Sequence, residues 1–172
     1  MNLQHPSLTL IGSLVILAGC RSPTEPGTNL SPDFAKSPNA PVNSASGGGT
    51  VDVPAGRSTY AFHASVNGAG IVSGGFEIHF SSTDANVHGD VTCFVVDGNQ
   101  AWFGGVVTRS SDETLVAVGS ELVWRAIDNG EGTNATADQI SAFASGPWTA
   151  DRCVEKPLFG TRDWTNGNVQ IR

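Results

Sequence analysis

The chain has 172 residues, of which 39% are hydrophobic and 15% are charged, and 16 acidic residues against nine basic ones give a net charge of −7. The acidic residues are scattered and no run of Lys or Arg forms a basic patch. Because a nucleic-acid backbone is held by clustered positive charge, this composition argues against a nucleic-acid partner.

An apolar run, residues 8–17, lies near the N-terminus. It is shorter than the roughly 20 apolar residues that span a bilayer, and its length fits the hydrophobic region of a secretory signal. The four residues that close it, Leu17-Ala18-Gly19-Cys20, resemble the lipobox of a bacterial lipoprotein. Residues 1–7 carry no Lys or Arg, and an ordinary cleaved secretory signal is the alternative.

The lipobox resemblance implies that residues 1–19 are a signal peptide and that Cys20 becomes the lipidated first residue of the mature chain. Each buried methylene of an acyl chain contributes about 0.8 kcal/mol, so several chains on one Cys hold a protein at a membrane without spanning it. Arg21 stands where some bacterial lipoproteins carry an Asp that retains them at the inner membrane. We therefore expect a cell-envelope protein, anchored by lipid at the outer membrane.

The next segment, residues 20–49, is predicted to be a flexible tether. It contains five prolines among Ser, Thr, Asn and Gly, a composition that cannot bury a core. The remaining residues, 50–172, are enough for one ordinary domain.

The domain holds two cysteines, Cys93 and Cys153. With Cys20 lipidated, they form an even pair in an exported and oxidising compartment, which predicts a disulfide between them. The alternative is a pair of buried free thiols.

Short alternating runs broken by turn residues predict an all-β antiparallel domain, either a single barrel or a two-sheet sandwich of about eight strands. The segment 91–96 is apolar on both faces, so we expect a central strand covered on both sides. We expect the C-terminal strand to close the sheet beside an early one. The predicted strands are residues 59–66, 75–80, 86–96, 100–108, 115–118, 121–127, 137–143 and 168–172.

The second and third of these strands form a predicted hairpin with residues 82–85 as its loop. This register places the apolar side chains on one face, because side chains alternate with period two. Its opposed pairs are Phe80 with Val87, Ile78 with Gly89, Phe76 with Val91, His79 with His88, and Glu77 with Asp90.

The polar face of that hairpin carries Glu77, His79, His88 and Asp90. Two imidazoles and carboxylates at cross-strand distances could ligate a divalent metal such as Zn²⁺. A solvated face of a half-buried sheet is the alternative interpretation.

A second candidate metal site is the acidic, Gly-rich loop that carries Asp128, Asn129, Glu131 and Asp138. Its oxygen ligands suit Ca²⁺, although their spacing does not match an EF-hand. The alternative is that these side chains cap turns, with Gly supplying positive φ.

Aromatic side chains offer a third possibility, a sugar-stacking face, if several of them are exposed together. Rings of this size more often fill cores. The candidates are Trp102, Trp124, Trp148, Trp164 and Tyr60.

Residues 87–93, 98–105, 128–132 with 138–141, and 167–171 together resemble a group of uncharacterised exported bacterial β-domains. The resemblance covers most of the chain after residue 50. It implies a β-fold outside the cytoplasm and assigns no catalytic residue.

Neither a Gly-x-Ser-x-Gly elbow nor a His-Glu-x-x-His motif is present in the sequence. The favoured hypothesis is a membrane-anchored envelope lipoprotein that acts as a binding or scaffold module without catalysis, with an envelope protein or a glycan as partner. The alternative is a metal-dependent or carboxylate hydrolase on the same β scaffold.

Overall fold

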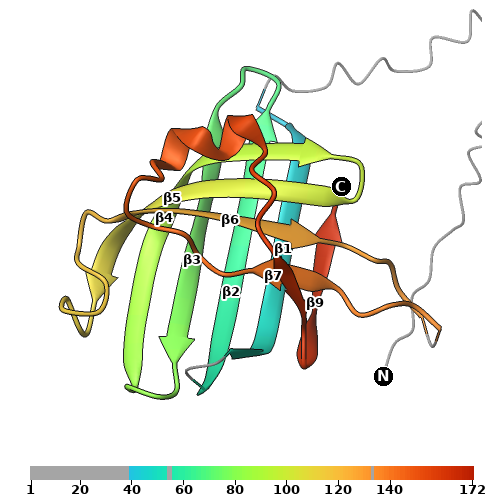
Figure 1. Cartoon of the computed structure of the whole chain (residues 1–172). Helices are drawn as coiled ribbons and strands as arrows, with labels where there is room; N and C mark the ends of the chain where they lie inside the picture. Colours follow the sequence, from blue (N-terminus) through green and yellow to red (C-terminus); the bar gives the residue numbers. More distant parts are fainter. Residues whose placement is uncertain (1–38, 54–55, 133) are drawn as a thin grey trace, which may run out of the picture. The chain divides into compact units, whose positions relative to one another are not determined.

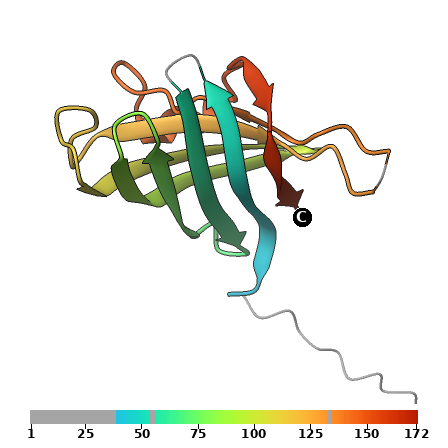
Figure 2. The ribbon, with the colours of Figure 1, turned by 90° about the horizontal axis from the view of Figure 1, so that it is seen from below.

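The computed structural model describes residues 39–53, 56–132 and 134–172 (Figure 1). Cys20, the predicted signal peptide and most of the predicted tether lie outside these residues. The described domain is one antiparallel sheet of nine strands in the order β8-β7-β6-β5-β4-β3-β2-β1-β9, curled into a half-barrel (Figure 2). The predicted all-β antiparallel class is confirmed.

The sheet and one short 3₁₀ helix account for the regular structure of the described residues. The elements are β1 (Pro41–Val53), β2 (Gly56–Asn67), β3 (Val72–Phe80), β4 (Ala85–Asp97), β5 (Gln100–Ser110), β6 (Glu121–Ile127), β7 (Gln139–Ser141), η1 (Ala150–Glu155), β8 (Thr161–Asp163) and β9 (Asn166–Ile171). None of the helical structure in these residues is long and apolar enough to cross a membrane.

Strand β1 lies largely inside the segment predicted to be tether, so the predicted boundary at residue 49 was wrong. It pairs with β2 on one side and with β9 on the other. Its small residues are needed for packing, because a Cβ at Gly47 would meet the Phe62 ring and a Cβ at Gly49 would meet Trp164. A Gly/Ser composition that is typical of a linker here makes room for the neighbours' aromatic rings.

Residues 115–118, predicted to be a strand, instead form turns between β5 and β6. The Asp112 carboxylate accepts hydrogen bonds from the backbone N–H groups of Thr114 and Leu115, at 3.0 and 3.3 Å. Such side-chain to backbone bonds compete with a ladder and favour a turn. Gly119 takes φ +86° in the same loop.

The β3–β4 hairpin has a four-residue loop, as predicted, but the loop is residues 81–84, so the pairing register is shifted by two residues. Ile78 faces Val87, and Phe76 faces Gly89. The reason is steric, since the Phe76 ring lies where a Cβ at position 89 would be. A shift of two preserves both faces but changes the partners, so His88 faces Glu77 and not His79.

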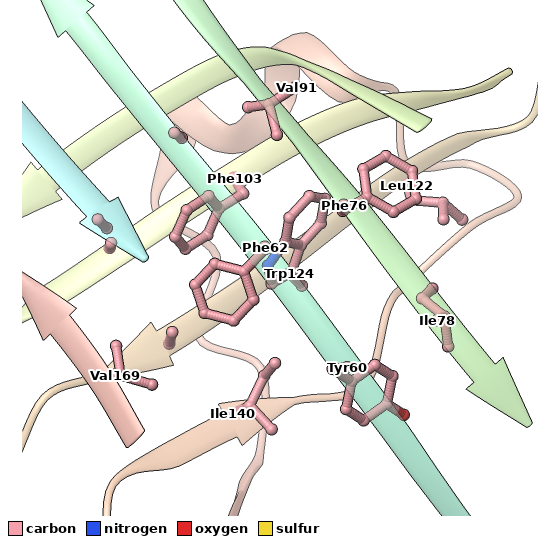
Figure 3. Close-up of a cluster of buried hydrophobic side chains, with 14 of the residues drawn as sticks. Tyr60, Phe62, Phe76, Ile78, Val91, Phe103, Leu122, Trp124, Ile140 and Val169 are labelled. Carbon is pink, nitrogen blue, oxygen red and sulfur yellow. The ribbon is translucent and has the colours of Figure 1, made fainter. Parts of the chain in front are cut away.

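The concave face of the sheet buries an aromatic core (Figure 3). The Trp124 ring stacks on Phe103 with centroids 5.0 Å apart and on Phe143 with centroids 4.4 Å apart. Phe62 and Phe76 approach Trp124 edge-on from the facing strands. The core is thus built from both halves of the curled sheet.

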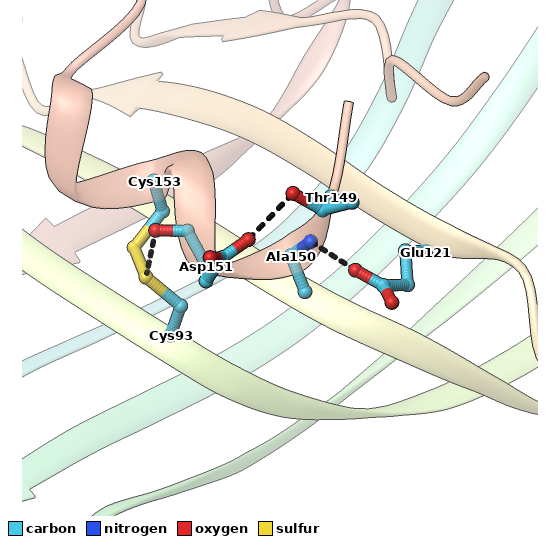
Figure 4. Close-up of a disulfide and its surroundings, with 6 residues drawn as sticks. All are labelled: Cys93, Glu121, Thr149, Ala150, Asp151 and Cys153. Atoms are coloured by element: carbon cyan, nitrogen blue, oxygen red, sulfur yellow. Dashed lines mark hydrogen bonds between the residues drawn. A yellow bond between two sulfur atoms is a disulfide. The ribbon is translucent and has the colours of Figure 1, made fainter. Parts of the chain in front are cut away.

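A second, smaller cluster covers the convex face of the centre of the sheet (Figure 4). Cys93 on β4 and Cys153 in η1 form the predicted disulfide, with their Cα atoms 6.1 Å apart. Helix η1 also rests on Gly104, where any Cβ would strike the backbone of Ala150. β4 is the fifth of nine strands and is covered on both faces, as predicted.

Candidate functional site

The acidic loop between β6 and β7 lies against the outer edge of β9, the last strand of the sheet. Asp138, which is buried, accepts the backbone N–H of Val169 at 2.6 Å and that of Asn129 at 2.7 Å. Asp128 accepts the N–H of Ile171 at 2.9 Å. These carboxylates therefore supply the hydrogen-bond acceptors that a further strand would have supplied.

The other predicted ligands of this loop take part in the same contact. The Asn129 amide donates to the Ala137 carbonyl at 2.7 Å, and Glu131 accepts from the side chain of Asn168 at 2.8 Å. All four residues have polar groups engaged in hydrogen bonds, either to β9 or within the loop. A calcium site at this loop stays a prediction, and Ca²⁺ would compete with backbone N–H groups for the same oxygens.

The second candidate metal set lies on the convex face of β3 and β4. His88 Nδ1 lies 3.7 Å from a Glu77 carboxylate oxygen, whereas His79 points to Asp84 at 3.1 Å. Asp90 is opposite Gly75, two pairs along the ladder from the pair of Glu77 and His88. His63, which is not among the predicted ligands, lies beside this group on β2, opposite Gly75, and the alternation of residues 59–66 could have indicated it.

An open depression of about 380 Å³ is lined by His63, Glu77, His88 and Asp90, and His79 is not part of its lining. Across the described ranges, no group of three or more His, Cys, Asp or Glu side chains is arranged to hold a metal ion. Zinc binding at this face therefore stays a prediction from the sequence.

The aromatic residues proposed for sugar stacking do not form an exposed platform. Trp102, Trp124, Trp164 and Tyr60 are each at most 5% exposed. Trp148 is half-buried, with its ring edge-on to Phe159 and the Arg152 guanidinium 4.8 Å above it. A glycan partner stays a prediction, without support from these rings.

An apolar pocket of about 280 Å³ is more enclosed than the depression on the convex face. It lies at the end of the half-barrel where β1 and β3 finish and β2 starts, next to the aromatic core. Its walls combine apolar side chains with hydroxyl groups, and none of the described residues that line it is charged. The lining residues are Val53, Ser58, Tyr60, Phe80, Ser82, Thr83, Leu115, Ala142 and Phe143.

Two buried hydroxyls mark the polar part of this pocket. Ser58 is 2% exposed and Tyr60 is 5% exposed. Burial raises the pKa of Tyr60 above its ordinary value, and a hydrogen bond from the Ser58 hydroxyl opposes part of that rise. Tyr60 therefore stays protonated, and able to donate a hydrogen bond, throughout the physiological pH range.

This pocket was not predicted from the sequence. Ser58 lies one residue before a predicted strand, and continuing that strand's alternation would have placed it beside Tyr60 and Phe62. Leu115 belongs to the predicted strand 115–118, which does not form. Comparison with family models, with curated proteins and with solved structures found no match to this chain.

The pH dependence of Tyr60 provides a direct test of its burial, because Tyr60 is the only tyrosine in the chain. Since the pKa is raised in the folded state, its contribution to stability is complete below about pH 10 and is lost as the pH rises further. We expect the tyrosinate absorbance of the native chain to appear above pH 10 and that of the denatured chain near pH 10. A native midpoint at or below the denatured one would contradict the burial.

Proposed function

We propose that this chain is a lipid-anchored lipoprotein of the bacterial envelope whose β-domain is a binding module without a catalytic step. The sequence Leu17-Ala18-Gly19-Cys20 supports the anchor. The exported setting agrees with the Cys93–Cys153 disulfide, because such bonds persist in oxidising compartments.

The observation that carries the binding role is the apolar pocket. Enclosed apolar depressions with a few convergent polar groups are the usual form of small-ligand sites, and the mouths of β-barrels are a common place for them. Here Val53, Phe80 and Phe143, at one end of the core, are only half-buried by the residues that the structure describes. Leu115, which is 45% exposed, stands at the rim.

The pocket lies at the C-terminal end of β1, and the predicted tether precedes the N-terminal end of the same strand. The tether would join β1 at Pro41, and the pocket lies at Val53. Thirteen residues of extended strand separate these ends by about 40 Å. The domain therefore presents its pocket far along the sheet from the residue that leads to the anchor.

The anchor is tested by expressing the chain in a bacterium that processes lipoproteins. We expect the native chain in the membrane fraction, with a mass that shows loss of residues 1–19 and addition of acyl chains at Cys20. Cys20→Ser should abolish the acylation and release the chain from the membrane, whereas Arg21→Ala should leave acylation intact. An unmodified Cys20 or a retained Met1 would contradict the anchor.

The binding role is tested with 1-aminonaphthalene, an uncharged fluorescent probe, and the full chain carrying Cys20→Ser. Its two fused rings are about twice the size of benzene, which fills a cavity of about 150 Å³. We expect saturable binding that Leu115→Ala weakens about fivefold, since the half-exposed side chain contributes about 1 kcal/mol. Val118→Ala is the matched control, because Val118 is 48% exposed in the same loop and does not line the pocket. Probe binding that is equal in the two variants would exclude the pocket as the site.

A further inference from the structure

Among the residues that the structure describes, none with a charged side chain lines the apolar pocket, and this restricts the ligands that it can take. Its walls are Val53, Phe80, Leu115 and Phe143, and its polar groups are all hydroxyls. Burying an ionised group without a paired charge is costly, whereas a neutral polar group needs only a hydrogen-bond partner. The chain's net charge of −7 adds a further, weaker penalty for anionic ligands.

We infer that the pocket binds an uncharged amphiphile, a molecule with an apolar chain or ring system and one hydroxyl or carbonyl group. This inference rests on the proposed binding function and names the chemical class of its ligand. Since benzene, with six heavy atoms, fills a cavity of about 150 Å³, a volume of about 280 Å³ holds about eleven heavy atoms. A medium-chain alcohol or a small bicyclic molecule has this size.

The Tyr60 hydroxyl is assigned as the group that binds the polar end of the ligand. Figure 3 shows its oxygen at the edge of the aromatic cluster, pointing away from Trp124. The Ser58 hydroxyl lines the same pocket, and both hydroxyls are buried. The protonated phenol can donate to a ligand acceptor, and a charged acceptor is not required.

The apolar end of the ligand would lie against Phe143 and Leu115. Phe143 stacks on Tyr60 with ring centroids 5.0 Å apart, so it forms a rigid wall beside the hydroxyl. Leu115 belongs to the β5–β6 loop and covers the rim. This order of groups, a hydroxyl at the inner end and apolar contacts toward the mouth, places the polar group of the ligand inward.

The test is displacement of 1-aminonaphthalene from the full chain at pH 7.5 by 1-octanol and by octanoate, which share a chain length and differ in charge. We expect 1-octanol to displace the probe at a concentration at least tenfold lower than octanoate does. Tyr60→Phe should raise the inhibition constant of 1-octanol about fivefold, once it is corrected for the probe's own Kd measured in the same variant. Val118→Ala should change neither.

Each opposite result has a defined meaning. Octanoate that displaces the probe as well as 1-octanol does would overturn the uncharged ligand class and leave the binding function in place. A Tyr60→Phe chain that binds 1-octanol normally would overturn the role of the Tyr60 hydroxyl. Absence of any Leu115-dependent probe binding would instead remove the proposed function itself.

Discussion

The backbone N–H groups of Val169 and Ile171 point away from β1 at the edge of the sheet, and the carboxylates of Asp138 and Asp128 accept them. An unpaired edge strand exposes a row of donors that invites association with another chain, and leaving a buried donor unsatisfied costs about 1–3 kcal/mol. The acidic loop satisfies these donors without adding a strand. It thereby fixes the last strand of the sheet beside the loop that joins β6 to β7.

With that edge fixed, the curvature of the sheet follows from where small and large residues meet. Gly89 and Gly105 lie beneath the Phe76 ring, and Gly47 lies beneath Phe62. The large rings can therefore lie flat on the concave face and reach Trp124 across the half-barrel. The aromatic core ends at Tyr60 and Phe143, and the apolar pocket begins at these same residues.

The convex face is covered at the centre of the sheet and exposed over β2 and β3. The disulfide and η1 cover the centre of β4 and β5, and the Trp102 indole N–H donates to the Pro157 carbonyl at 3.0 Å. The convex face of β2 and β3 remains polar, with His63 and Glu77 exposed. Within the described residues, the half-barrel thus has an aromatic core on its concave face, a centre covered by η1 on its convex face, and a pocket at one end of the core. The proposed binding function is placed at this pocket.

The strands with alternating patterns, the disulfide and the central position of β4 could be predicted because each depends on local sequence or on residue counts. Strand β1 could not be predicted, because its small residues are required by packing against rings on β2 and against Trp164, which are distant in the sequence. The hairpin register was missed by two residues since the pattern fixes the face but not which glycine accommodates Phe76. The pocket depends on Ser58 and Leu115, whose burial and position are set by tertiary packing.

Native-state hydrogen exchange of the Val169 amide tests the central constraint most directly. Val169 is fully buried, and its N–H depends on a single side-chain oxygen of Asp138. The structure predicts that this amide exchanges as slowly as those in the centre of β4 and β5, and that Asp138→Asn accelerates it selectively. Fast exchange in the native chain, or no change in the variant, would contradict the closure of the sheet by the acidic loop.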